Sequence, residues 1–252
     1  MNILQNIILD KQKEVAQKKK FIPRETWEML PGFAKKTRSL KKALLKQNSN
    51  GIIAEFKRKS PSSQYRNDIS INDVLPVYEK YAAGISILTD EIYFGGTNDD
   101  LLIADNLVDI PLLRKDFIID EYQLYESKGL GADVILLIAA LHSPQQIKHL
   151  AKMARALNLE IILEIHDEKE LGHICDEVDM VGVNNRNLNT FETDLENSFR
   201  LIHQIPKVKP SISESGITTG SELKALRHAG FRGFLIGSLF MKTNNPAQAL
   251  EN

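Results

Sequence analysis

The fold of this chain is decided by the stretch Ile53-Ala54-Glu55-Phe56-Lys57-Arg58-Lys59-Ser60-Pro61-Ser62. It begins as an apolar run and ends in a charged loop that contains a proline. Glu55 and Lys57 are two residues apart, and side chains at that spacing point to the same face of a β-strand. Charges at such a position are costly unless they are paired or functional. We therefore predict that this strand ends at a functional site.

Seven more short apolar runs follow, separated by polar loops and amphipathic helical patterns. Together the eight runs span residues 52–57, 85–89, 111–117, 133–138, 160–165, 179–184, 210–214 and 233–236. Strands that alternate with helices pair in parallel through right-handed crossovers. Eight such units are typical of a closed (β/α)8 barrel, the TIM barrel, which has about 250 residues. The alternative, an open doubly wound sheet, usually has a glycine-rich turn after its first strand, and residues 58–62 contain no glycine.

The helices between these runs have recognisable start signals. Residue pairs with the spacing of a capping box are Thr97 with Asp100, Asp120 with Gln123, Ser143 with Gln146, Thr193 with Glu196, and Thr219 with Glu222. A last short helix is predicted to begin at Asn245-Pro246.

The residues before the first strand predict a helical extension. Residues 1–20 have the pattern of an amphipathic helix. Its apolar stripe consists of Ile3, Leu4, Ile7, Ile8 and Val15, and its opposite face carries Lys11, Lys13 and Glu14. Residues 27–33 are interpreted as a connector and 40–47 as a second helix. We predict a single domain over residues 1–252, in which 1–50 form the N-terminal extension and 51–252 form the barrel.

The composition argues against several classes of protein. The 252 residues carry a formal net charge of −1, so there is no excess of basic residues for binding nucleic acid or an anionic membrane. No apolar run approaches the roughly 20 residues of a membrane span. The one cysteine, Cys175, cannot form an intramolecular disulfide, which favours a cytoplasmic location. The six histidines lack the spacing of metal ligands, so we expect no metal site and interpret each histidine as a surface or helix residue.

Polar residues gather at the C-terminal ends of the predicted strands, where the active site of a barrel lies. In chain order they are Glu55, Lys57, Thr89, Lys115, Glu164, Asn184, Arg186, Glu214, Ser215, Gly237 and Ser238. Some have a simpler interpretation, such as a structural ion pair for Glu55 and Lys57 or a surface charge cluster for Lys115. The phase of the strands favours function, because Lys115 and Glu164 continue the inward apolar faces of their strands.

Two loops suggest a phosphate site. Glu214-Ser215-Gly216-Ile217 follows the seventh run, and Ile236-Gly237-Ser238-Leu239 follows the eighth. Small residues allow backbone N–H groups to approach an anion, and this is where phosphate usually binds in such barrels. Tight turns would also explain the small residues. Ser60 and Lys57 come from the first strand, which neighbours the eighth in a closed barrel, and could complete the site.

Five motifs resemble the signature of the indole-3-glycerol-phosphate synthase family. They are the stretch 53–62, Leu113-Arg114-Lys115-Asp116-Phe117-Ile118, Leu163-Glu164-Ile165, Val181-Gly182-Val183-Asn184-Asn185-Arg186-Asn187-Leu188 and Ser213-Glu214-Ser215-Gly216-Ile217. The resemblance covers essentially the whole chain. It implies a carboxy-lyase of tryptophan biosynthesis that needs no metal or organic cofactor. Its phosphorylated substrate, 1-(2-carboxyphenylamino)-1-deoxyribulose 5-phosphate, undergoes ring closure, decarboxylation and dehydration to indole-3-glycerol phosphate.

The resemblance also implies roles for particular residues. Lys115 matches the general acid and Glu164 the general base. Lys57 would pair with the substrate carboxylate or phosphate, and Glu55 would hold Lys57 or the anilino nitrogen. Asn184 and Ser215 would bind the substrate's hydroxyls and amine. Further substrate or phosphate contacts are expected from Ser60, Arg186, Gly216, Gly237, Ser238, Phe94, Phe117, Leu136 and Leu188. The division of steps between Lys115 and Lys57 is left open.

Several points limit or compete with this interpretation. Many relatives have a glycine soon after the first motif, whereas this chain has Ser63-Gln64-Tyr65-Arg66, so closure of that loop is left open. An isomerase barrel that binds phosphoribosylanthranilate would not need the two lysines and two glutamates or the N-terminal extension. A silent barrel that serves as a binding module would not need the matched polar residues. We expect a monomer, with a homodimer as the alternative.

Overall fold

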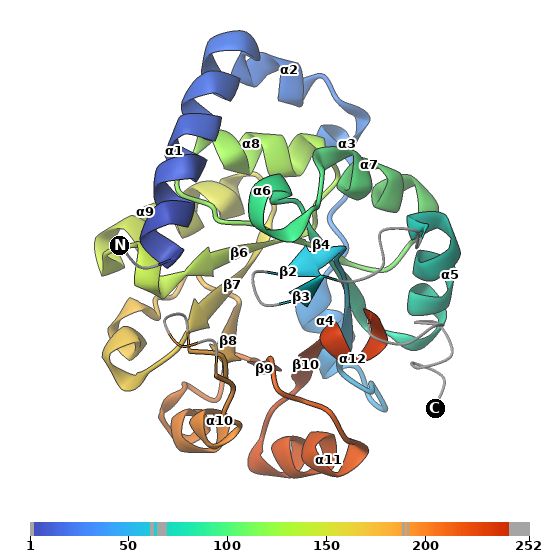
Figure 1. Ribbon diagram of the computed structural model, residues 1–252, viewed down its shortest axis with the longest axis vertical. Helices are drawn as coiled ribbons and strands as arrows, with labels where there is room; N and C mark the ends of the chain where they lie inside the picture. Colours follow the sequence, from blue (N-terminus) through green and yellow to red (C-terminus); the bar gives the residue numbers. More distant parts are fainter. Residues whose placement is uncertain (1–2, 61–62, 65–69, 188–189, 191, 242–252) are drawn as a thin grey trace.

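The protein is described by a computed structural model that covers residues 3–60, 63–64, 70–187, 190 and 192–241. Eight parallel strands close into a barrel in the order β1-β10-β9-β8-β7-β6-β5-β4 (Figure 1), which confirms the predicted TIM barrel. The barrel strands are β1 Ile52–Phe56, β4 Gly84–Leu88, β5 Leu112–Lys115, β6 Val134–Ile138, β7 Glu160–Ile165, β8 Met180–Asn184, β9 Ser211–Glu214 and β10 Gly233–Ile236. A separate two-stranded hairpin follows β1 and consists of β2 Lys59–Ser60 and β3 Ser63–Gln64.

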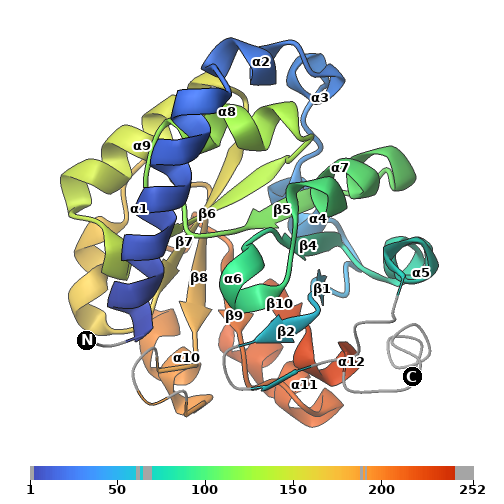
Figure 2. The ribbon, with the colours of Figure 1, turned by 45° about the horizontal axis from the view of Figure 1, so that its top comes forward.

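Helices surround the strands and cover one end of the barrel (Figure 2). Those before β1 are α1 Ile3–Phe21, α2 Arg24–Glu28, α3 Pro31–Ala34 and α4 Leu40–Leu45. The others are α5 Ile71–Tyr81, α6 Glu91–Phe94, α7 Asn98–Leu107, α8 Tyr122–Gly129, α9 Pro144–Ala156, α10 Glu196–Leu201, α11 Gly220–Ala229 and α12 Ser238–Met241. Short 3₁₀ segments are η1 Ala139–Leu141, η2 Glu168–His173 and η3 Ile202–Gln204.

The strands separate two apolar layers, as their alternation requires. Ala54 and Phe56 point outward and pack under the helices, in a cluster that includes Leu75 and Tyr78 of α5. Ile53 points into the barrel, where an inner cluster fills the lumen. Glu55 lies two residues beyond Ile53 and therefore continues the inward face, as predicted from the spacing.

Helix α4 closes the end of the barrel opposite the strand C-termini. Its Leu40 and Leu44 belong to the inner cluster, with 1% and 3% of their surface exposed. Gly84, at the start of β4, allows this approach, because a Cβ there would lie 2.7 Å from Leu40 Cδ1. Helix α4 thus packs over the end of the barrel that lies opposite the strand C-termini.

The N-terminal extension differs from the prediction in two respects. Lys11 was placed on the polar face of α1 but is buried, because it lies one turn from both Ile7 and Val15 on the face toward the barrel. The stretch 27–33 was interpreted as a connector, whereas it contains the end of α2 and most of α3. Trp27 explains this local order, because its ring packs edge-on against Tyr122 of α8 at 6.1 Å.

The predicted capping boxes at Thr97, Ser143 and Thr219 are confirmed. In each, the side chain of the first residue accepts from the backbone N–H three residues on, and the side chain of that residue accepts from the backbone N–H of the first. The prediction for Thr193 is wrong, because α10 begins at Glu196, whose N–H is bonded to Asp194, and Thr193 pairs with Arg186 in an isolated bridge. At the start of α8, the Asp120 carboxylate accepts from the N–H of Tyr122, and Gln123 Oε1 accepts from the N–H groups of Ile119 and Asp120. The helix predicted at Asn245-Pro246 lies outside the described residues.

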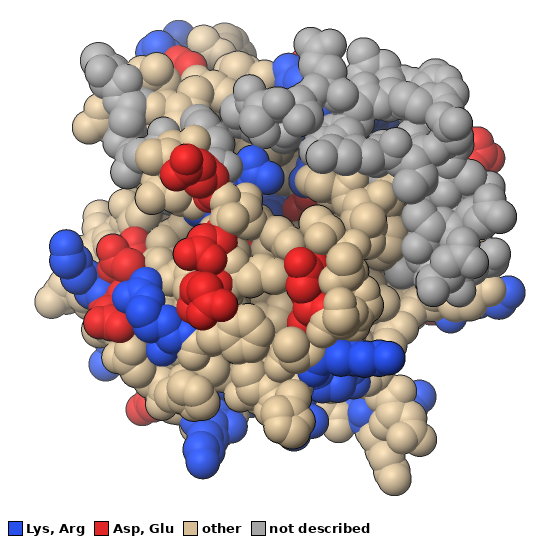
Figure 3. Space-filling model, turned by 60° about the horizontal axis from the view of Figure 1, so that its bottom comes forward, with Lys and Arg blue, Asp and Glu red and all other residues tan. Residues whose placement is uncertain are grey.

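The charged surface is mixed in sign. The face drawn in Figure 3 carries both acidic and basic side chains among the described residues. No helix within the described ranges is long and apolar enough to cross a membrane.

Candidate active site

A cavity of ≈ 620 Å³ opens at the C-terminal ends of the barrel strands. Of the predicted site residues, those that line it are Glu55, Lys57, Phe94, Lys115, Phe117, Leu136, Glu164, Asn184, Arg186, Ser215, Gly216, Gly237 and Ser238. Ser60 belongs to β2 in the hairpin after β1, and Leu188 lies outside the described residues. Closure of the barrel thus brings residues from six different strand ends to one cavity.

Lys115 lies at the centre of the polar floor. Its Nζ is 2.8 Å from Oε2 of Glu214 and 3.1 Å from Oε2 of Glu164. Burial opposes the positive charge, but these two carboxylates and that of Glu55 raise the pKa of Lys115 well above its ordinary value. Lys115 is therefore a protonated ammonium group held between carboxylates from β7 and β9.

The two carboxylates beside Lys115 have opposite pKa shifts. Burial alone would raise the pKa of Glu164, but Lys115 and His166 hold it well below its usual range. Burial and the charge of Glu164 raise the pKa of Glu214 to about 7, although Lys115 partly opposes the shift. Oε1 of Glu214 is buried and accepts no hydrogen bond from the described residues. Of these two carboxyl groups, Glu214 is therefore the one that is more readily protonated.

Glu214 and His166 were not assigned a role from the sequence. Glu214 was recognised only as a polar strand end, although its phase on β9, two residues after the inward Ile212, predicts that it faces the lumen. Gly182 makes room for it, because a Cβ there would collide with Oε1 of Glu214. The interpretation of every histidine as a surface or helix residue is wrong for His166, whose side chain is 13% exposed and lies beside Glu164.

Glu55 and Lys57 form the ion pair that their spacing predicts, between Oε1 and Nζ. Their side chains are 5% and 12% exposed, so the pair forms part of the cavity wall. Gly237, at the end of β10, is required for this packing, because a Cβ there would collide with Glu55. Gly237 thus has a steric role in addition to the anion-binding role predicted for its loop.

The loop after β9 has the backbone geometry of a tight turn. Ser215 and Gly216 have φ values of 68° and 84°, a left-handed conformation that is uncommon for serine. The backbone bends sharply here beside the start of α12, and Ser238 and Gly237 line the same part of the cavity. At the end of the neighbouring strand β8, Asn184 Oδ1 accepts a hydrogen bond of 3.0 Å from the N–H of Arg186.

Aromatic and aliphatic side chains form the remaining wall. The rings of Phe94 and Phe117 are 6.0 Å apart at an angle of 41°. Ile3, Leu4 and Ile7 of α1 also line the cavity, although no pattern in the sequence predicts them there. The first two turns of the N-terminal extension therefore belong to the wall of the site.

A buried network of charges connects α1 to the strand that carries Lys115. Lys11 Nζ lies 2.7 Å from Glu14, 3.0 Å from Asp90 and 2.9 Å from Asp116. Asp116 directly follows Lys115 in the chain and also accepts from Arg114 at 3.1 Å. Burial alone would raise the pKa of Asp116, but Lys11 and Arg114 hold it well below its usual range.

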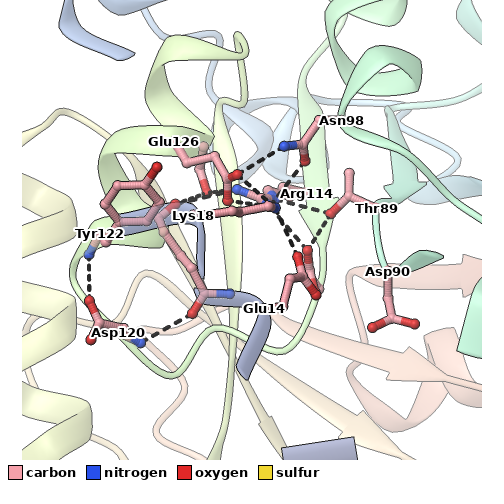
Figure 4. Close-up of polar contacts among 12 residues, drawn as sticks. Glu14, Lys18, Thr89, Asp90, Asn98, Arg114, Asp120, Tyr122 and Glu126 are labelled. Carbon is pink, nitrogen blue, oxygen red and sulfur yellow. Dashed lines mark hydrogen bonds and ion pairs between the residues drawn. The ribbon is translucent and has the colours of Figure 1, made fainter. Parts of the chain in front are cut away.

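The network extends from Arg114 to helix α8 (Figure 4). Arg114 is fully buried and contacts Glu126 at 2.8 Å, and Lys18 of α1 contacts the same carboxylate at 2.9 Å. Asn98 and Thr89 also bond Arg114, at 3.3 and 3.0 Å. Figure 4 shows these side chains converging from α1, α7, α8 and the strand ends. The loops that follow β4 and β5 are therefore tied to α1 by buried ion pairs.

The fold and site define an eight-stranded barrel enzyme whose acidic and basic groups meet at the C-terminal ends of the strands. Within that class, residues 4–252 match the family model described as indole-3-glycerol phosphate synthase. The chain is 49% identical to the indole-3-glycerol phosphate synthase of Bacteroides thetaiotaomicron over 253 residues, which cover 100% of this chain and 97% of that protein. It is 40% identical to that of Magnetococcus marinus, over 99% and 97% of the two chains. The chain therefore belongs to the indole-3-glycerol phosphate synthase family.

The family defines the overall activity, and confirms the resemblance seen in the sequence. The protein is a decarboxylating lyase of tryptophan biosynthesis that acts on a phosphorylated small molecule and forms indole-3-glycerol phosphate. Solved structures add only the fold. Thiamine phosphate pyrophosphorylase from Pyrococcus furiosus has a TM-score of 0.60 at 14% identity, over 84% of this chain and 95% of that one. Orotidine 5'-monophosphate decarboxylase from Sulfolobus solfataricus has the same TM-score and identity, over 80% and 94%.

Proposed function

We propose that Lys115 is the general acid and Glu164 the general base of the ring-closing reaction. The observation that carries this proposal is the position of the Lys115 ammonium group, buried between Glu164 and Glu214. Because two carboxylates stabilise its positive charge, the Lys115 side chain is protonated before the reaction. It is also surrounded by groups that can exchange a proton with it. It also stabilises negative charge that develops on a nearby oxygen.

In the first step the aryl carbon that carries the carboxylate attacks the ribulose ketone. A carbon–carbon bond forms, the carbonyl electrons move to oxygen, and Lys115 gives that oxygen its proton. Carbon dioxide then leaves, and its bonding electrons restore the aromatic ring. Phe94, Phe117 and Leu136 supply the apolar wall against which the ring is held.

In the second step water is lost to form the indole double bond. Glu164 removes a proton from the methylene carbon next to the ring nitrogen, and the hydroxyl group leaves with a proton from Lys57. Glu55 holds Lys57 at the cavity wall through their ion pair. Glu214 contacts the ammonium group of Lys115 from the other side and returns a proton to it, because its pKa of about 7 leaves it partly protonated at neutral pH.

The substrate's remaining groups fit the rest of the cavity. Its phosphate would lie against the turn of Ser215 and Gly216 and the start of α12 at Ser238, where small residues leave backbone N–H groups accessible. Ser60 and Gly237 belong to the same side of the barrel. Asn184 and Arg186 follow β8, the strand next to β9, and would bind the hydroxyl and carboxylate groups. We further propose a single 1–252 domain that acts as a monomer.

The assignment of the acid is tested with Lys115→Ala. Because it removes both a proton donor and an electrostatic stabiliser, we expect kcat to fall by a factor of about 10² or more, with little change in substrate binding. Indole-3-glycerol phosphate is followed by its fluorescence, and Lys13→Ala on the exposed face of α1 is the matched control. A kcat near that of the unmodified protein would refute the role of Lys115.

The phosphate position is tested with Ser238→Asp. A carboxylate at this position would repel the substrate phosphate, so KM should rise while kcat changes less. The readout is KM and kcat, both obtained from initial rates over a range of substrate concentrations. An unchanged KM would place the phosphate elsewhere in the cavity.

A further inference from the structure

His166 lies between two carboxylates, one of which is Glu164. Its Nε2 is 3.2 Å from Oε1 of Glu164, and its Nδ1 is 3.4 Å from Oε2 of Glu170. A neutral imidazole has one N–H and one lone pair, so one nitrogen would direct its lone pair at a negative oxygen. Only the imidazolium form places positive charge, and no lone pair, beside both carboxylates. The geometry therefore favours a positive charge on His166.

The backbone around His166 holds the ring in place. Glu170 Oε2 also accepts a hydrogen bond of 2.6 Å from the N–H of His166, which fixes the carboxylate that faces Nδ1. Asn197 donates to the carbonyl oxygens of His166 and Asn184, at 2.9 and 3.1 Å. The segment after β7 is thus anchored to the one after β8, and the ring cannot move far from Glu164.

The groups around Glu164 show why a second cation is needed there. Lys115 faces it from β5, Asn184 from β8 and Glu214 from β9. When Lys115 gives its proton to the ketone oxygen, its positive charge disappears from beside Glu164. His166 takes no part in that proton transfer and keeps its charge through the step. Of the two cations that the described ion pairs place beside Glu164, it is the one that remains.

We propose that His166 is a positioning residue for the general base: its imidazolium, anchored by Glu170, keeps the Glu164 carboxylate ionised and oriented while Lys115 is deprotonated. This inference rests on the proposed role of Glu164. Nε2 of His166 is close to Oε1 but is not aligned for a hydrogen bond. Oε1 is therefore held by charge rather than by a directional bond, and Oε2 turns to the substrate once Lys115 has reacted.

The raised pKa of His166 supports this role. Burial lowers the pKa of an imidazole, but Glu164 and Glu170 outweigh burial and raise it to about 10. His166 therefore remains charged throughout the neutral range, in which an ordinary histidine with a pKa of about 6.5 is mostly neutral. The His166 ring therefore does not need to take up a proton during the reaction in order to offset the negative charge of Glu164.

The test replaces His166 by glutamine, which keeps a hydrogen-bonding amide but cannot become charged. Without the cation, the acidic limb of the kcat profile should move to higher pH by about 1–3 units. The value of kcat at neutral pH should fall by about ten- to a hundredfold because the base is less well oriented, while KM changes less than about threefold. The matched control is His173→Gln, since His173 lies in the same segment but bonds only the backbone carbonyl groups of Glu170 and His142 among the described contacts.

Two further measurements keep the result decisive if His166→Gln folds poorly. Glu170→Gln removes one of the two carboxylates that stabilise the charge on His166. The basic limb of the kcat–pH profile should therefore move to lower pH, while the acidic limb stays unchanged. In the unmodified protein, nuclear magnetic resonance of the histidine rings should show both nitrogens of His166 protonated at pH 8. A neutral His166 at that pH, or the same pH profile in both variants and the control, would overturn the proposal.

A parallel variant, Glu164→Gln, distinguishes failure of the proposed base from failure of the inference about His166. Loss of activity in Glu164→Gln, together with an unchanged profile in His166→Gln, would refute only the inference about His166. Full activity in Glu164→Gln would refute the proposed base itself. Loss in both variants, with a shifted acidic limb only in His166→Gln, is the result expected from the structure.

Discussion

Replacement of Lys11 by methionine tests whether α1 is locked to the barrel by charge. The ammonium group of Lys11 contacts Glu14, Asp90 and Asp116, and its side chain is 1% exposed. Methionine fills a similar volume but leaves two buried carboxylates without their shared cation. Loss of one partner from a buried ion pair costs about 3–5 kcal/mol. For a chain of this size that corresponds to a fall in Tm of about 6–20 °C.

The assay is thermal unfolding followed by circular dichroism, with Lys13→Met as the matched control. Lys13 lies on the same helix and pairs with Asp10 at 3.1 Å, but its side chain is 72% exposed, and exposed pairs contribute about 0–1 kcal/mol. Lys11→Met should also raise KM, because Ile3, Leu4 and Ile7 of the same helix line the cavity. A loss of stability no greater than that of Lys13→Met would refute the argument that this network is buried and essential.

Two other substitutions test the geometry of the site. Gly237→Ala should raise KM and lower kcat by about tenfold or more, because the added Cβ must displace Glu55 from Lys57. The control is Gly172→Ala, because a Cβ added at Gly172 would have nothing within 4 Å. Equal kinetics in the two variants would contradict the steric role of Gly237. Glu214→Gln should abolish a carboxyl titration near pH 7 in the infrared spectrum. The pKa of Glu214 is about 7 in the folded protein, compared with 4.5 for an ordinary glutamate. Its contribution to stability is therefore present below pH 4.5 and is lost as the pH rises through 7. The same dependence of stability on pH in Glu214→Gln and in the unmodified protein would contradict this.

Several features were predictable because they depend on local spacing. The eight strand–helix units follow from apolar runs and capping residues, and the capping boxes at Thr97, Ser143 and Thr219 are single local patterns of three or four residues. The inward orientation of Glu55 follows from alternation along one strand. The exception at Thr193 has a tertiary cause, since that residue pairs with Arg186 across a loop instead of starting α10.

Other features depend on residues far apart in the sequence, and no local pattern indicates them. Lys11 has the pattern of an ordinary surface lysine of an amphipathic helix, yet its partners Asp90 and Asp116 lie 79 and 105 residues away, in loops that the closed barrel brings beneath α1. His166 could have been noticed from its spacing of two from Glu164, but its charge depends on Glu170 and on burial. The opposite pKa shifts of Glu164 and Glu214 likewise require both strands and Lys115 to meet.

The sequence by itself therefore determined the barrel, its N-terminal helical extension and the ionisable groups at the strand ends, because these depend on periodicity and on motifs within a few residues. Only the tertiary structure decided which of those groups touch. Closure of the strands put Lys115 between Glu164 and Glu214 and brought the first turns of α1 to the cavity. The strength of a buried charge depends on the distances to its partners and on the exclusion of water, and both are properties of the folded chain.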